Sequence, residues 1–153
     1  GLETGSLTPW LFRSLKALGL PVVCMDARRA ADAMKARPAK TDKTDALALA
    51  EMLRAGWYKA VHVKSEDSHR HRALLGARDQ LIKNKRMMLG QVRGMLKPFG
   101  ITFGCRQGTT RFGERARDAT AHDSILSKCV GALFDALAAL DAQIAILDAE
   151  VKR

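Results

Sequence analysis

The feature that most constrains the fold of this chain is an apolar repeat in its last thirty or so residues. Eight apolar residues between Leu126 and Val151 alternate spacings of four and three. A heptad pattern of this kind is typical of a helix that packs along one seam against another helix. The residues of the seam are Leu126, Val130, Leu133, Leu137, Leu140, Ile144, Leu147 and Val151.

A second long helix is predicted from about Lys64 to Lys97, where apolar pairs recur every seven residues in a stretch without proline. Pro98-Phe99-Gly100 would end this helix. The two helices predict a coiled-coil helical hairpin over residues 64–153, with a loop at about 98–120 that lacks clear periodicity. A second copy could cover the remaining apolar positions, so we expect a homodimer or higher homo-oligomer.

Residues 1–63 have a different pattern, that of an α/β domain. Leu2-Glu3 resembles a strand end, Thr8 and Pro9 resemble a helix cap and first helical residue, and the apolar run at 21–25 suits a buried strand. A basic helix from about Ala27 to Ala36, ended by Pro38, and a further helix up to Ala55 should follow. Trp57, Tyr58, Val61 and Val63 should then pack back as an extended segment. One full strand cannot form a sheet, and no Met opens the chain, so we expect a fragment of a longer protein.

The charge of the chain favours a polyanionic partner. Lys and Arg number 26 against 16 Asp and Glu, for a net charge of +10, and nucleic acid is the first candidate. The excess lies upstream of Pro98, since residues 64–97 hold nine basic residues against three acids. The alternative is a solvated helix face without a partner. The candidate phosphate-binding residues of the helix are Arg70, Arg72, Arg78, Lys83, Lys85, Arg86, Arg93 and Lys97.

The composition excludes several other classes of protein. No apolar run approaches the roughly 18 residues that span a bilayer, and no signal-peptide pattern opens the chain. Cys24, Cys105 and Cys129 are odd in number and lack C-x-x-C spacing, so neither a disulfide framework nor a zinc site is indicated. We expect a cytoplasmic protein without a membrane partner.

Two carboxylates lie three residues apart in Lys40-Thr41-Asp42-Lys43-Thr44-Asp45-Ala46, where an apolar-periodic helix begins. This spacing would place Asp42 and Asp45 on one face of the first turn, where they could share a hard divalent cation. The alternative is that they only cap the helix, because Asp and Thr are common at helix starts. Lys40 and Lys43 flank the acids and could meet a nucleic-acid backbone.

Taken together, the Leu2-Glu3-Thr4-Gly5 turn, the unit ending at Val22–Arg28 and the K-T-D-x-x-D-A string resemble the DEDD transposases. These are insertion-sequence recombinases with a RuvC-like catalytic domain, related to the Piv DNA invertases, and they insert a long coiled coil after that domain. The resemblance implies a ribonuclease-H-like fold in which four acids bind Mg²⁺ or Mn²⁺ and act on DNA. Glu3, Asp42 and Asp45 would be the second, third and fourth acids.

The resemblance also implies what this chain lacks. The first acid would precede Gly1, and a domain with a nucleophilic serine would follow Arg153. Many relatives have a further small residue between the glutamate and the glycine of the turn, so this chain departs from the family pattern at Glu3. An RNA guide that chooses the DNA, and a place of action at the bacterial nucleoid, are implied by the resemblance alone.

The sequence therefore predicts the C-terminal part of a RuvC-like domain at residues 1–63, followed by the hairpin at 64–153, with helix predominating overall. The parent protein is expected to cut and rejoin DNA, and this piece alone to be inactive. Two alternatives remain open. One is a non-catalytic nucleic-acid-binding and dimerisation module, and the other is a Holliday-junction resolvase.

Overall fold

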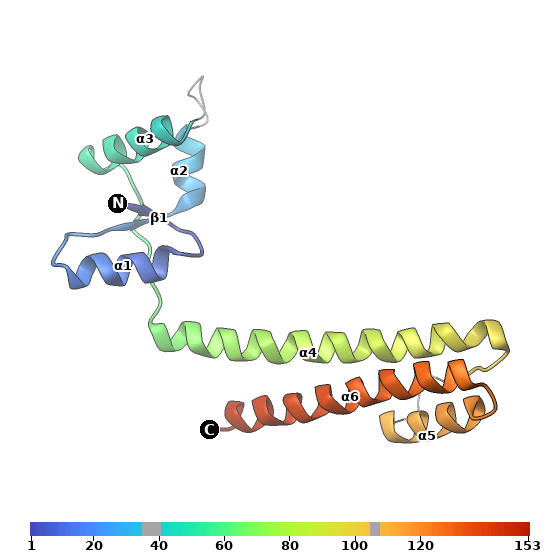
Figure 1. Cartoon of the computed structure of the whole chain (residues 1–153). Coiled ribbons are helices and arrows are strands. Elements are labelled where there is room, and N and C mark those ends of the chain that lie inside the picture. The colour runs from blue at the N-terminus through green and yellow to red at the C-terminus, as the bar shows by residue number, and fades with distance from the viewer. Residues whose placement is uncertain (35–40, 105–107) are drawn as a thin grey trace. The chain divides into compact units, whose positions relative to one another are not determined.

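The computed structural model describes residues 1–34, 41–104 and 108–153. They form two compact units, Gly1–His69 and Arg70–Arg153, and Figure 1 shows the elements of each. Each unit is described by itself below. Helix predominates in the described residues, and their strands form one small parallel sheet. The prediction of a mainly helical chain with a small α/β part is confirmed.

The first unit is built on a strand–helix–strand motif. Strand β1 (Leu2–Glu3) pairs in parallel with β2 (Cys24–Met25), with Leu2 opposite Cys24 and Glu3 opposite Met25. Helix α1 (Thr8–Ala17) connects them, because parallel neighbours cannot be joined by a tight turn. The α1 helix ends before Gly19, which has a φ of 76° and so adopts a conformation that glycine accepts readily.

Strand β2 is also paired on its other edge. Ala60 bridges Met25 in the antiparallel sense, the Asp26 amide donates to the Lys59 carbonyl at 3.1 Å, and the Val61 amide donates to the Cys24 carbonyl at 2.8 Å. The predicted extended segment after Gly56 is thus found beside the sheet. This double pairing leaves Met25 only 1% exposed.

Two helices complete the first unit: α2 (Ala27–Met34) and α3 (Asp42–Arg54). Their buried residues are small or flexible, namely Ala30, Ala48 and Met52. Cys24 is also buried, and burial raises the pKa of its thiol because the thiolate would lose its hydration. It is a core residue, as expected for an isolated cysteine.

Two local predictions in this unit were wrong. The strand expected over residues 21–25 is confined to Cys24–Met25. Thr8 is not a cap: α1 begins at Thr8 itself, with Leu7 at the cap position and without a side-chain cap bond. The Thr8 hydroxyl instead donates to the Glu3 carbonyl at 2.5 Å, because the turn folds back on the strand.

The second unit contains two long helices. Helix α4 (Glu66–Leu96) starts in the last residues of the first unit and continues into η1 (Lys97–Phe99), and Gly100, with a φ of 74°, ends the run as predicted. Helix α6 (Ser124–Val151) is capped by Asp123, whose carboxylate accepts from the Ile125 and Leu126 amides, each at 2.9 Å.

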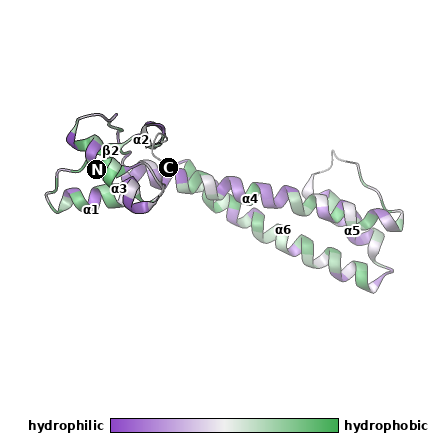
Figure 2. Ribbon diagram, turned by 90° about the horizontal axis from the view of Figure 1, so that it is seen from above, coloured by the Kyte–Doolittle hydropathy of each residue, from purple (hydrophilic) through white to green (hydrophobic). Residues whose placement is uncertain are grey.

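Ion pairs define the register of α4 against α6. Arg78 pairs with Asp148 and Lys85 pairs with Asp141. The pairs are one heptad apart on each helix and occur in opposite order, so the two helices run antiparallel within this unit, as Figures 1 and 2 both show. The heptad seam is buried only at its start: Leu126, Val130 and Leu137 are buried, whereas Val151 is 45% exposed.

The predicted loop at about 98–120 was wrong, because a helix, α5 (Thr109–Thr120), occupies most of it. Phe112, Ala116 and Thr120 are fully buried at successive turns of this helix. Only one of these is a large apolar residue and the helix is polar on average, so the sequence alone did not predict it. The core joins α4, α5 and α6 through Val92, Leu96, Phe112, Ala116, Val130, Phe134 and Leu137.

Helix α6 corrects a further expectation, since it is long and apolar enough to cross a membrane by length and composition alone. In Figure 2 the ribbon of α6 is coloured largely as hydrophobic residues. Its buried Val130, Phe134 and Leu137 belong to the three-helix core, and its Asp141 and Asp148 pair with cations of α4. Most of the helix is not buried, since only 17% of its most apolar 18-residue window is buried.

Candidate functional site

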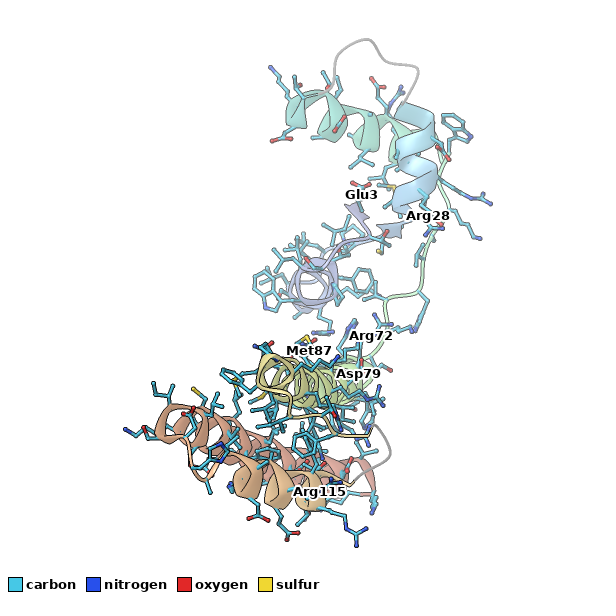
Figure 3. All side chains as sticks on the ribbon, turned by 90° about the vertical axis from the view of Figure 1, so that its right-hand side faces the viewer. Glu3, Arg28, Arg72, Asp79, Met87 and Arg115 are labelled. Atoms are coloured by element: carbon cyan, nitrogen blue, oxygen red, sulfur yellow. The ribbon has the colours of Figure 1, made fainter. Side chains whose placement is uncertain are left out.

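The turn after β1 fixes the backbone on both sides of Glu3. The Leu2 amide donates to the Val23 carbonyl at 2.8 Å and the Thr4 amide donates to the Met25 carbonyl at 3.1 Å. Together with the Thr8 bond to the Glu3 carbonyl, these bonds hold Glu3 at the carboxyl end of a parallel strand. Its side chain is exposed there, and Figure 3 labels it. This edge is where parallel sheets commonly place functional groups.

Thr4 and Asp26, two residues that the sequence alone did not single out, complete this edge. The Thr4 hydroxyl accepts from the Ala27 amide at 3.1 Å, and the Asp26 carboxylate accepts from the Arg28 and Arg29 amides at 2.9 and 3.2 Å. Both side chains therefore cap α2 and tie it to the ends of the two strands. An Asp directly before a helical run is a signal that could have revealed Asp26 as this cap.

Helix α3 carries both predicted carboxylates in its first turn. Its cap is a pair of threonines: the Thr41 hydroxyl accepts from the Thr44 amide at 3.2 Å, and the Thr44 hydroxyl accepts from the Thr41 amide at 2.9 Å. This reciprocal arrangement is a capping box. Asp42 is exposed and Asp45 is half-buried, and the capping bonds of α3 are made without their carboxylates.

Glu3 and the α3 acids belong to the same unit but do not form a closed cluster. A methyl group on Gly1 would lie 2.4 Å from Leu53 Cδ1, so the start of β1 contacts the end of α3. Figure 1 shows β1 and α3 running in opposite directions, which puts Glu3 toward the amino end of α3. Among the described residues, no group of three His, Cys, Asp or Glu side chains lies close enough to hold a metal ion.

The basic residues of α4 divide into two groups, and the first contacts the rest of the helical unit. Arg78 and Lys85 are half-buried and pair with the α6 acids described above. The Arg93 guanidinium lies over the Phe112 ring, 4.4 Å from its centroid, a cation–π contact inside the core. These three cations therefore stabilise the packing of the helices.

The second group faces solvent. Arg70, Arg72, Lys83, Arg86 and Lys97 are exposed, and so is Lys43 at the start of α3. Lys83 pairs with Asp79 one turn away, at 2.7 Å, and this hydrogen bond is the first cause of the lowered pKa of Asp79. Arg72 and Asp79 are labelled in Figure 3. Lys40 lies outside the described residues.

Comparison with known proteins decides the family. The sequence model of the IS110-type DEDD transposases, described as "Transposase", matches residues 3–100. This chain belongs to that transposase family. The matched range contains Glu3, Asp42, Asp45 and every predicted basic residue, and it ends before α5 and α6.

Two curated relatives are also named as transposases. The transposase for insertion sequence element IS1111A of Coxiella burnetii is 26% identical over 153 residues, which cover 97% of this chain and 41% of the relative. The Sinorhizobium fredii protein y4qE, whose naming as a transposase is provisional, is 32% identical over 136 residues, which cover 84% of this chain and 34% of the relative.

This transposase chain thus spans about two fifths or less of the curated relatives it matches. No solved structure matches it significantly. The comparisons therefore bear on the family of the chain, and the placement of its side chains comes from the structure described above.

Proposed function

We propose that this chain is part of a DNA transposase that cuts and rejoins DNA strands with divalent metal, and that Glu3, Asp42 and Asp45 are metal ligands in the whole protein. The observation that carries the proposal is the capping box of α3. Because Thr41 and Thr44 cap the helix, the two carboxylates of its first turn are not needed as caps. Hard cations such as Mg²⁺ or Mn²⁺ prefer carboxylate oxygens of this kind.

The ligand set of this chain is incomplete by itself. The described residues contain no cluster of three candidate ligands, so the proposal requires further acids from the rest of the protein and closer approach of Glu3 to α3. When bound, a metal pair supplies activation of the attacking oxygen and stabilisation of the leaving one. The side chains of this chain would contribute ligands and orientation, and the isolated chain would be inactive.

The architecture of the first unit supports a ribonuclease-H-like or RuvC-like domain as the parent fold. A parallel strand–helix–strand motif with an antiparallel third segment is compatible with one part of such a mixed sheet. The helical unit would then be the inserted coiled-coil arm. Its partners would be DNA, a guide RNA and further copies of the protein, acting in the bacterial cytoplasm at the nucleoid.

The test uses the full-length protein with Asp42→Asn and Asp45→Asn, which keep side-chain size while removing the charge. We expect each variant to lose Mn²⁺ binding by calorimetry and strand transfer on the element's own DNA, with little change in the midpoint of thermal unfolding. Thr41→Ala is the matched control. It should lower the stability of the protein by about 0.5–2 kcal/mol, the usual cost of a lost cap, while the metal still binds.

The opposite pattern would contradict the proposal. If Asp42→Asn and Asp45→Asn destabilised the protein as Thr41→Ala does and left strand transfer intact, the acids would be structural. That result would favour a non-catalytic nucleic-acid-binding module. Strand cleavage of junction DNA without any element sequence or RNA would instead favour a Holliday-junction resolvase.

A further inference from the structure

The first unit contains a cavity that is distinct from the acidic residues. It has a volume of about 550 Å³ and lies between α2, the end of α3 and the segment that follows α3. Met52, Trp57 and Tyr58 supply its apolar surface, and Arg29, Asp32 and Lys59 supply its charges. A volume of this size is within the range of small-ligand sites. Met52 follows Asp45 by seven residues, about 10 Å along the helix axis.

The backbone that carries Trp57 is fixed by the carboxyl end of α3. The Trp57 amide donates to the Met52 carbonyl at 2.9 Å, and the Gly56 amide donates to the Leu53 carbonyl at 3.2 Å. With Gly56 at a φ of 68°, these two bonds form a Schellman motif. The indole is nevertheless 68% exposed, so a rigid turn presents a large aromatic face at the edge of a cavity.

The two cations of the cavity are also held on anchored backbone. The Arg29 amide donates to the Asp26 carboxylate at 3.2 Å in the first turn of α2. The Lys59 carbonyl accepts from the Asp26 amide at 3.1 Å. The side chains of Arg29 and Lys59 therefore both extend from backbone that is hydrogen-bonded to Asp26.

The chemistry of this lining selects a class of ligand. A bare anion would need little aromatic surface, and an apolar ligand would need no cations. An exposed indole beside two cations suits a planar base that carries a phosphate, because bases stack on aromatic faces and phosphates pair with Arg and Lys. Asp32 adds a carboxylate, so the site is not a uniformly positive surface.

We propose that this cavity binds one unpaired nucleotide of a single-stranded nucleic acid, with its base stacked on Trp57 and its phosphate near Arg29 and Lys59. The inference rests on the proposed function, since a strand that is cut and rejoined must expose unpaired nucleotides. Paired bases lie inside a duplex and cannot reach the indole. The site therefore discriminates single strands from duplexes.

The test measures binding of the full chain to short unstructured single-stranded DNA and RNA by fluorescence anisotropy. Trp57→Ala should weaken binding about 5- to 150-fold, the loss expected for one base–aromatic stack. Trp10→Ala is the matched control, because Trp10 is 62% exposed on α1 and does not line the cavity; it should change affinity little. Duplex DNA of the same length should bind Trp57→Ala and the unchanged chain equally.

A second measurement observes the indole directly. In the Trp10→Phe background Trp57 is the only tryptophan, and its emission should be quenched by single strands and not by inorganic phosphate. Comparing DNA with RNA shows which strand the site prefers. Circular dichroism of each variant identifies any loss of folding, and the quenching experiment does not require removal of Trp57.

The outcomes separate this inference from the proposed function. Equal effects of Trp57→Ala and Trp10→Ala, or no quenching by bound single strands, would overturn the nucleotide site while leaving the transposase proposal intact. Quenching of the Trp57 emission by inorganic phosphate alone would indicate that the cavity binds anions without base stacking. Failure of the Asp42 and Asp45 variants to affect strand transfer would overturn the proposed function without changing the binding result.

Discussion

At the residue scale, the start of α3 shows which polar side chains cap the helix and which are available to bind metal. The sequence alone could not distinguish these two roles. Four of the five side chains at positions 41–45 carry an oxygen that could cap the helix, namely those of Thr41, Asp42, Thr44 and Asp45. The structure assigns the capping bonds to Thr41 and Thr44. A hydroxyl at the cap position and another at the third helical position satisfy each other's amides, so Asp42 and Asp45 can serve a different purpose.

Asp79 offers a residue-scale prediction about pH. Its hydrogen bond to Lys83, with the nearby charges of Lys83, Arg86 and Arg78, lowers its pKa from the ordinary 3.8. Because the folded pKa is the lower one, this interaction stabilises the folded chain above the ordinary pKa and is lost as the pH falls through the folded pKa. Lys83→Met should raise the pKa of Asp79, as measured by NMR of its carboxyl carbon.

The control for this measurement is Lys97→Met, an exposed lysine on the three-residue helix after α4. It should leave the pKa of Asp79 unchanged, since it is more than four helical turns away along the chain. An unchanged pKa in Lys83→Met would mean that the ion pair does not persist in solution.

At the element scale, α5 decides how the long helices are held together at one end. The Phe112 ring lies 5.1 Å from that of Phe103 and 5.4 Å from that of Phe134, in edge-to-face contacts. Gly113 follows it against the same Phe134 ring, where an added methyl group would lie 3.0 Å from the ring carbons. The α5 helix therefore approaches α6 closely, and a glycine permits that approach.

Phe112→Ala tests this role of α5. The side chain is fully buried, so its removal should lower the free energy of unfolding by about 3–5 kcal/mol, through lost burial and a residual cavity. Chemical denaturation followed by circular dichroism measures the change. Glu114→Ala, two residues away and exposed, should change stability by less than about 0.5 kcal/mol. Similar costs for both variants would refute the packing described here.

At the scale of the whole molecule, the structure reduces the number of cations offered to a nucleic acid. Arg78, Lys85 and Arg93 are committed to contacts within the helical unit. Arg72, Arg86 and Lys97 are exposed and should carry more of the binding. The sequence alone cannot separate the cations that contact other helices from those that face solvent, because it does not show which face of α4 packs against its neighbours.

Salt dependence of binding tests this division. The measured quantity is the slope of the logarithm of the DNA-binding constant against the logarithm of salt concentration. In a chain with Arg72→Gln, Arg86→Gln and Lys97→Gln the magnitude of this slope should fall by about 2–3, since each lost phosphate contact releases nearly one counterion fewer. The matched control is Arg78→Gln with Lys85→Gln, which should lower stability and leave the slope nearly unchanged. Equal slopes for the triple variant and the unchanged chain would mean that this face is not a binding surface.

Self-association remains a prediction that belongs to the whole molecule. An apolar groove of about 440 Å³ lies between α4 and α6, lined by Met87, Met88 and Leu140 among others, and Met87 is 65% exposed; Figure 3 labels it. If a second copy covers this groove, Met87→Glu should lower the mass measured by light scattering. Helicity should not change, because the side chain is outside the core. An unchanged mass would contradict pairing through this face.

The sequence by itself determined the elements with strong local signals. The heptads of α4 and α6, the proline and glycine after α4, and the polar start of α3 each depend on neighbours within one or two helical turns, so they could be predicted from the local sequence. The family could also be predicted, because the K-T-D-x-x-D-A string together with the turn at Glu3 resembles the family pattern, and the family model matches residues 3–100.

Tertiary structure alone decided what depends on partners distant in sequence. Helix α5 is stabilised by contacts of Phe112 with α4 and α6, and its own residues are too polar on average to predict a buried helix. The roles of Arg78 and Lys85 follow from acids more than fifty residues away. The cavity around Trp57 exists because α2, α3 and the segment after Gly56 converge. Such contacts form only when the chain folds, and no local pattern encodes them.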